Sequence, residues 1–225
     1  MDKYFDILLK CPLFKGVEKN QLKSMIKCLK GKIITVKKNE NIFFEGELTQ
    51  NFGIVLIGKI KIIRDDYYGN RSVLTILKES EMFAEVFAFA GLNTFPVSAV
   101  ADKDSEIMLL NTDKVMTMCS ASCHYHNLVI KNLLKEMAQK TLSLNKKIRY
   151  MSEKTTKNKL MLYLLDQAKQ NNSCEFTIPF DRQALADYLG VERSAMSAEI
   201  GKLKKLGIID TKGSWFNVKK IDEDI

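Results

Sequence analysis

Long hydrophobic runs are missing from this sequence, and no apolar stretch reaches the roughly eighteen residues that a membrane-spanning helix needs. The first residues include Asp2 and Asp6 and lack a continuous apolar core, so we expect no signal peptide. Cysteine is scarce, with 5 residues scattered over 225. An odd, scattered set is not typical of a disulfide framework and points to a reducing compartment. We therefore expect a cytoplasmic protein with no membrane partner.

Motifs of enzyme active sites are missing as well. The sequence contains no G-x-x-x-x-G-K-[ST], G-x-G-x-x-G or H-E-x-x-H pattern and no cysteine–histidine spacing typical of a metal site. Its 2 histidines, His124 and His126, are separated by two positions, so their side chains point in different directions on a strand or a helix. We expect both to be surface or loop residues. We also expect no catalytic residues and no metal ligands, which argues against an enzyme.

The charge of the chain is strongly basic. Lysine and arginine together number 35 against 27 aspartates and glutamates, which gives a formal net charge of +8. Such an excess favours a polyanionic partner without identifying it. With 46% hydrophobic residues among 225, the chain can form one large or two modest domains, each with a hydrophobic core.

The first half of the sequence predicts a helical segment followed by a β-rich domain. Within residues 1–30 one apolar face has helical spacing and consists of Leu22, Met25, Ile26 and Leu29. From 32 to about 110, short β-rich runs alternate with turn residues about every ten positions, as is typical of a sandwich or roll. The predicted strands cover 33–36, 42–44, 52–57, 59–63, 73–77, 97–101 and 106–110.

Residues 126–151 predict one long helix that pairs with a second copy of the chain. Its apolar positions recur at alternating spacings of four and three, which is the heptad pattern of a coiled-coil seam. The seam consists of Ile130, Leu134, Met137, Thr141, Leu144, Ile148 and Met151. Between residues 131 and 159, basic residues outnumber acidic ones by nine to two. These polar flanks favour a homodimer over the alternative, in which the helix packs on its own β domain.

Residues 180–203 predict two short helices joined by a tight turn. Asp181 suits the N-cap of the first helix, and Gly190 supplies the positive φ that ends it. The apolar face of the second helix consists of Met196, Ile200 and Leu203, and its outer face of Arg193, Ser194, Ser197 and Ala198. A helix with such a small, polar outer face can enter a major groove of DNA. An ordinary helical hairpin is the alternative.

Further elements flank this pair of helices. A helix is expected at 160–169 and a loop at 171–173. The strand-like runs 207–210 and 215–218 are joined by 211–214, which predicts a hairpin wing with Lys212 at its tip. Helices followed by such a hairpin make a winged helix-turn-helix.

This order of elements resembles the cAMP receptor protein and FNR family of bacterial transcription regulators. The local signatures are 9–14, 55–62, 82–86 and, most specific, 181–194 with 204–209. The resemblance implies an α+β fold in three segments. These are an effector-sensing β-roll (a jelly roll like that of cyclic nucleotide-binding domains) at 1–125, a dimerisation helix at 126–152 and a winged helix-turn-helix at 153–225. It also implies a homodimer on double-stranded DNA, an inverted-repeat operator, and RNA polymerase as a further partner.

The effector pocket of the family matches this chain only in part. The family's conserved pocket glutamate falls on Glu85, but Ala84 stands at the glycine before it, and Phe95-Pro96 stands where an arginine and a serine hold the cyclic phosphate. Phenylalanine and proline offer a phosphate neither a cation nor a donor. We therefore expect an unidentified small-molecule effector, apolar or weakly polar, in place of cAMP, and no cofactor can be named. The candidate pocket residues are Glu85, Phe95, Val97, Leu144 and Asn145.

A redox- or cofactor-sensing regulator of the same family is the alternative. Iron–sulfur members of the family use cysteines clustered near the N-terminus and one central cysteine, and haem-binding members use a histidine of the roll. In this chain an iron–sulfur cluster would have to use Cys11, Cys28, Cys119 and Cys123. Four thiolates can hold a cluster, but the N-terminal clustering is missing. Cys119 and Cys123 are one helical turn apart and could instead be redox-active.

The DNA contacts follow from the second helix and its surroundings. Arg193 matches the first base-reading arginine of the family and can donate two hydrogen bonds to guanine O6 and N7. Ser194 and Ser197 can read base edges or phosphates. Arg182 and Gln183 match family positions that contact phosphate. Because Ser194 and Ala198 replace the family's acid and second arginine, we expect a different operator.

Overall fold

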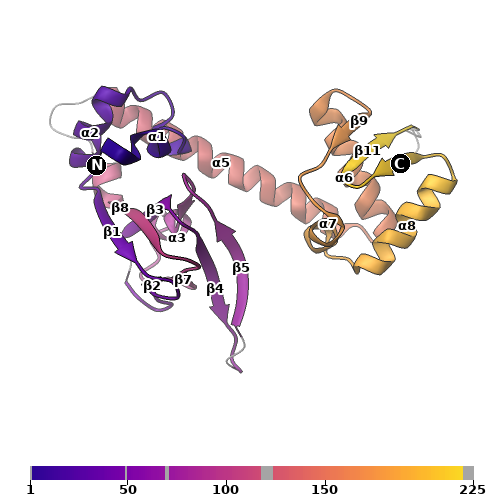
Figure 1. Cartoon of the computed structure of the whole chain (residues 1–225), viewed down its shortest axis with the longest axis horizontal. Helices are drawn as coiled ribbons and strands as arrows, with labels where there is room; N and C mark the ends of the chain where they lie inside the picture. Colours follow the sequence, from indigo (N-terminus) through magenta and orange to yellow (C-terminus); the bar gives the residue numbers. More distant parts are fainter. Residues whose placement is uncertain (1, 49, 69–70, 118–123, 220–225) are drawn as a thin grey trace. The chain divides into compact units, whose positions relative to one another are not determined.

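The structure is a computed structural model that describes residues 2–48, 50–68, 71–117 and 124–219 (Figure 1). The chain divides into two compact units, residues 1–138 and 139–225. The division falls inside the long helix α5 (His124–Ser152), which contributes residues to both units. The segment boundaries 125/126 and 152/153 remain a prediction, and the acidic tail from Ile221 lies outside the described residues.

Two antiparallel four-stranded sheets form the β-roll of the first unit (Figure 1). One has the order β1-β8-β3-β6 and the other β2-β7-β4-β5. Their shared core includes Phe43, Val55, Phe83, Phe95 and Ile107. The strands are β1 (Lys32–Val36), β2 (Asn41–Phe43), β3 (Asn51–Ile57), β4 (Ile60–Asp65), β5 (Arg71–Leu77), β6 (Met82–Phe83), β7 (Ser98–Ala101) and β8 (Ser105–Asn111). The β-roll and every predicted strand are confirmed, whereas the two-residue β6 was not predicted.

Short helices complete the first unit. They are η1 (Asp2–Tyr4), α1 (Phe5–Leu8), η2 (Pro12–Phe14), α2 (Lys19–Cys28), α3 (Glu85–Phe89) and α4 (Thr112–Met116). Helix α2 buries the predicted apolar face, and Leu29 follows it into the same core. Residues of β3 and β8, among them Phe52 and Met108, lie in that core as well. The N-terminal helices therefore cover one face of the roll.

The first part of α5 packs on the first unit along a face that the heptad pattern did not reveal. Val129 and Leu133, four residues apart, are buried in its core, and Met137 packs against the same core. Met137 was predicted to lie in the dimer seam, so the alternative of packing on the chain's own domain holds for this residue. Other seam residues stay accessible: Ile130 is half-buried, Thr141 is exposed, and the exposed fractions are 65% for Leu134, 58% for Leu144, 53% for Ile148 and 47% for Met151.

The expectation that both histidines are surface or loop residues is wrong for His126. This residue lies on α5 with 3% of its surface exposed, and its Nε2 donates a hydrogen bond of 2.8 Å to the carbonyl oxygen of Val115. Its Nδ1 lies 4.0 Å from the Cys28 sulfur. A buried imidazole is tolerated because its polar atoms have partners. The side chain of His124 is outside the described part of the structure.

The second unit contains three helices and a small antiparallel sheet. The helices are α6 (Thr156–Asn171), α7 (Arg182–Leu189) and α8 (Arg193–Lys205), and the strands are β9 (Glu175–Thr177), β10 (Ile209–Lys212) and β11 (Trp215–Val218). The sheet order is β10-β11-β9. The predicted helix pair and wing are confirmed, whereas β9, which pairs with β11, was not predicted. Only its central residue, Phe176, is buried, so it carries little apolar signal.

The last turn of α5 belongs to the core of the second unit. Tyr150 is 1% exposed, and its hydroxyl donates a hydrogen bond of 2.7 Å to the Asp166 carboxylate on α6. Arg149 also pairs with Asp166. The ring of Tyr150 meets that of Tyr163 edge-on, with 5.7 Å between the centroids. Burial raises the pKa of Tyr150, and the hydrogen bond to Asp166 adds to the effect. This tyrosine is therefore a neutral donor at physiological pH.

Candidate nucleic-acid interface

Helix α7 is fixed at both ends by the residues that the sequence singles out. The Asp181 carboxylate accepts a hydrogen bond of 2.8 Å from the backbone amide of Ala184, as an N-cap does. Leu185 and Leu189 are fully buried on its inner face. Gly190 follows with a φ of 61°, a left-handed conformation that costs glycine little. The sharp turn that separates α7 from α8 therefore depends on this glycine.

Helix α8 presents the predicted outer face to solvent. Its inner side chains, Met196, Ile200 and Leu203, are at most 7% exposed. Arg193, Ser194, Ser197 and Ala198 are all exposed. Ser194 donates a hydrogen bond of 2.6 Å to the carboxylate of Glu192, the residue just before the helix. This contact was not predicted from the sequence. The Ser194 hydroxyl is thus held locally, whereas Arg193 extends from the first turn.

An open depression lies where α7 and α8 meet, with a volume of about 630 Å³. It is lined by Gln183, Ala186, Asp187, Gly190, Val191, Glu192, Arg193 and Ser194. The amide of Gln183 donates a hydrogen bond of 2.9 Å to Asp187 one turn along α7. The depression therefore brings together three of the predicted contact residues: Gln183, Arg193 and Ser194.

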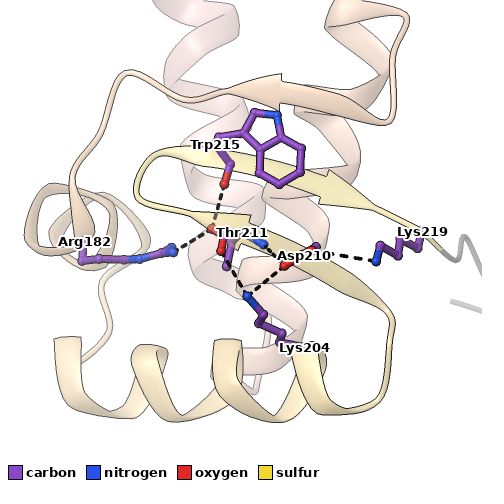
Figure 2. Close-up of polar contacts among 6 residues, drawn as sticks. All are labelled: Arg182, Lys204, Asp210, Thr211, Trp215 and Lys219. Atoms are coloured by element: carbon purple, nitrogen blue, oxygen red, sulfur yellow. Dashed lines mark hydrogen bonds and ion pairs between the residues drawn. The ribbon is translucent and has the colours of Figure 1, made fainter.

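The wing is a hairpin of β10 and β11 with Lys212 at its turn. Lys212 is exposed, and Gly213 after it has a φ of 59°. Thr211 donates a hydrogen bond of 2.7 Å across the hairpin to the carbonyl of Trp215 (Figure 2). Lys204, in the last turn of α8, forms an ion pair of 2.9 Å with Asp210. The wing is thus tied to the C-terminal end of α8, the helix that begins with Arg193.

Arg182 does not line the depression that holds Gln183, Arg193 and Ser194. Its guanidinium is half-buried over the ring of Phe216, 4.8 Å from the centroid, and donates a hydrogen bond of 2.8 Å to the Thr211 hydroxyl (Figure 2). Among the described residues, its buried Nη1 has no hydrogen-bond partner. Burial lowers the pKa of Arg182. The side chain therefore faces the wing in this structure.

The candidate effector residues of the roll are buried. Ala84, which the family resemblance aligns with a glycine, has a φ of 66°, and Glu85 begins α3 with 2% of its surface exposed. The ring of Phe95 stacks on Phe43 with 4.5 Å between the centroids, and Val97 is 6% exposed. Phe95 thus occupies the interior of the roll. Leu144 and Asn145 are exposed residues of the second unit.

Cofactor and membrane features were searched over the described residues only. There, no group of three or more histidine, cysteine, aspartate or glutamate side chains is placed to hold a metal ion. Cys11 is buried and Cys28 half-buried, and Cys119 and Cys123 lie outside the described ranges. In that same part of the chain, no helix combines the length and apolar character needed to cross a bilayer.

Comparisons with known proteins match both halves of the chain. Residues 33–122 match the family model of the cyclic nucleotide-binding domain, and residues 158–223 that of the Crp-like helix-turn-helix domain. The cyclic AMP receptor protein of Thermus thermophilus is 23% identical over 88% of this chain and 88% of its own length. A CRP-like cAMP-activated global transcriptional regulator of Mycobacterium tuberculosis is 28% identical over 48% of this chain and 46% of its own length.

A solved structure supports the same fold. The catabolite activator protein of Thermus thermophilus aligns with a TM-score of 0.54 and 22% identity, covering 92% of this chain and 93% of its own. The first model covers the β-roll and the second the winged helix-turn-helix, and the long helix α5 lies between the two matched ranges in the sequence. The chain therefore belongs to the Crp/Fnr family and is a Crp-like transcription regulator with a helix-turn-helix DNA-binding domain.

Proposed function

We propose that this regulator binds an operator in double-stranded DNA by sequence, with α8 in the major groove. The observation that carries this proposal is the outer face of α8, on which Arg193, Ser197 and Ala198 are exposed while Met196 and Ile200 anchor the helix. Small side chains allow close approach to base edges, and an arginine in the first turn can donate two hydrogen bonds to guanine. Arg193 is the residue that specifies sequence in this proposal.

Phosphate contacts surround this helix. Lys212 at the wing tip is exposed, and Gln183 at the start of α7 lies in the same depression as Arg193. Exposed lysines at 154 and 157 add positive charge before and within the first turn of α6. Contacts of this kind give affinity and orientation and make binding sensitive to salt, but they do not discriminate between sequences.

The proposed regulator is a homodimer whose operator is an inverted repeat. The exposed side chains Leu134, Leu144, Ile148 and Met151 supply an apolar seam on α5 for a second copy. A twofold dimer places two copies of α8 on half-sites roughly one helical turn, about 34 Å, apart. As a transcription regulator it would act in the cytoplasm with RNA polymerase as a further partner.

The proposed effector is a small apolar or weakly polar molecule other than cAMP. Both named relatives are described as receptors of, or activated by, cAMP. Here the position of the phosphate-binding arginine is taken by Phe95, whose ring packs on Phe43 inside the roll. Titration calorimetry with cAMP should show no binding, and specific micromolar binding would contradict this part of the proposal. The absorbance and mass spectra of the native protein test the iron–sulfur and haem alternative directly.

The sequence-reading role of α8 is tested with Arg193→Ala on an operator selected from random duplexes. Loss of the two-pronged guanine contact should weaken operator binding by about 1–3 kcal/mol and relax preference at one base pair per half-site. Lys205→Ala is the control, because it removes one positive charge from the opposite end of the same helix, where the side chain is also exposed. If Arg193→Ala left the ratio of operator to scrambled-DNA affinity unchanged, α8 would not be the element that reads sequence.

A further inference from the structure

A short chain of hydrogen bonds connects the start of α7 to the wing. Arg182 Nη2 lies 2.8 Å from Thr211 Oγ1, which in turn lies 2.7 Å from the carbonyl oxygen of Trp215 (Figure 2). The direction of both bonds is fixed, because a guanidinium only donates and a carbonyl only accepts. The Thr211 hydroxyl therefore accepts from Arg182 and gives its one proton to Trp215. Removing the hydroxyl breaks both contacts at once.

The guanidinium of Arg182 is placed at a cost to stability. It is half-buried over Phe216, and its Nη1 is fully buried without a hydrogen-bond partner in the described structure. The carboxylate of Asp210, in the wing, is paired with Lys204 and Lys219. Among the described residues no carboxylate is paired with Arg182, and burying part of a cation without such a partner costs free energy.

The geometry of β10 indicates what this placement of Arg182 does. Thr211 and Lys212 are neighbours on one strand, and successive side chains of a strand point to opposite faces. When Thr211 is held toward Arg182, Lys212 is held toward solvent. A second tether, the 2.9 Å ion pair between Lys204 and Asp210, holds the same strand to the end of α8. Two contacts from two helices thus fix the strand that carries Lys212.

We propose that Arg182 is a positioning residue that acts through Thr211 to hold the wing where Lys212 meets a DNA phosphate. This inference rests on the proposed function, in which the wing contacts DNA. It gives Arg182 a role different from the phosphate contact that the family resemblance implies. The positioning role requires a guanidinium, because one of its nitrogens donates to Thr211 while its plane stacks on the Phe216 ring.

The test measures affinity for the selected operator against salt concentration. Lys212→Ala should lower the slope of log affinity on log salt by about 0.9, the value for one phosphate contact. Thr211→Val, which removes no charge, should lower it by the same amount, and the double variant should bind no more weakly than either single variant. Thr211→Ser keeps the hydroxyl and should restore the wild-type slope. Thr177→Val, on an exposed position of the adjoining β9, is the matched control.

Arg182→Lys separates positioning from direct contact. Lysine keeps the charge and binds phosphate well as a point charge, but it cannot bond Thr211 and stack at the same time. A positioning role predicts that Arg182→Lys lowers the slope as Thr211→Val does. Should Thr211→Val fail to fold by circular dichroism, Arg182→Lys combined with Lys212→Ala provides the same test of non-additivity.

The possible outcomes distinguish this inference from the proposed function. If the wild-type chain selects no duplex and binds DNA without salt dependence, the proposed function fails. If the wild type binds its operator but Thr211→Val and Arg182→Lys both keep the wild-type slope, the positioning role alone is overturned, and Arg182 remains a direct phosphate contact. Independent, additive losses from Thr211→Val and Lys212→Ala would overturn it as well.

Discussion

The proposed dimer seam gives the prediction with the largest expected effect: replacing Leu144 and Ile148 with lysine should produce monomers. These side chains are 58% and 53% exposed in the single chain, so somewhat more than half of each surface is available for burial by a partner. Full burial of a leucine-sized side chain stabilises by roughly 1.5–3 kcal/mol, so each position contributes about 1–1.5 kcal/mol. A twofold dimer loses four such side chains, or about 4–6 kcal/mol, which weakens the dimer about a thousand- to twenty-thousand-fold.

Light scattering and sedimentation at micromolar concentration measure this change directly. Leucine and lysine have similar helix propensities, so α5 itself should persist in the double variant. The control replaces Leu92 and Leu206 with lysine; these residues are 45% and 66% exposed and lie outside α5. This control variant should remain dimeric. A double variant at Leu144 and Ile148 that was still dimeric at micromolar concentration would refute the seam.

Three further predictions concern stability. His126→Ala should lower the free energy of unfolding in denaturant by about 1–3 kcal/mol, because the carbonyl of Val115 loses its buried donor; an unchanged value would contradict the structural role. Gly58→Ala should cost at least about 2 kcal/mol and lower the melting temperature, because φ is 106° and a methyl group would collide with the Ser105 hydroxyl. Lys204 and the Thr211 amide hold the pKa of Asp210 below its usual range. The stabilisation that Asp210 gives the folded state is therefore complete above about pH 4 and is lost as the pH falls through the pKa of Asp210 in the folded protein. Asp210→Asn should therefore flatten the acid limb of the stability profile, and an unchanged limb would count against the Lys204 pair.

The DNA-binding helices were predictable because their signals are local. The N-cap of α7, the glycine at 190 and the apolar spacing of α8 are all encoded within 24 consecutive residues, and the structure reproduces each of them. The strands of the roll were predictable for the same reason, since alternating apolar runs end at glycine and aspartate turns. The left-handed backbone at Ala84 was not predicted, because alanine favours that conformation less than glycine does.

The features that the sequence did not reveal depend on partners far along the chain. Nothing near His126 indicates that Val115 and Cys28 enclose it, because Cys28 is almost a hundred residues away. Arg182 finds its hydroxyl partner 29 residues later, in a strand whose register no local pattern sets. The role of Met137 in the core of the first unit was hidden because a heptad records that a residue is apolar but not which surface covers it.

The last turn of α5 determines which C-terminal fragment of this protein can fold on its own. A fragment that began at residue 153 would remove Tyr150, whose ring and hydroxyl fill the core of the second unit and satisfy Asp166. It would leave a gap beside Tyr163 and an unpaired carboxylate, in a domain too small to tolerate either. The portable DNA-binding module of this regulator therefore includes the last turns of its long helix. Any fusion of this module to a different sensor must join within α5 rather than after it.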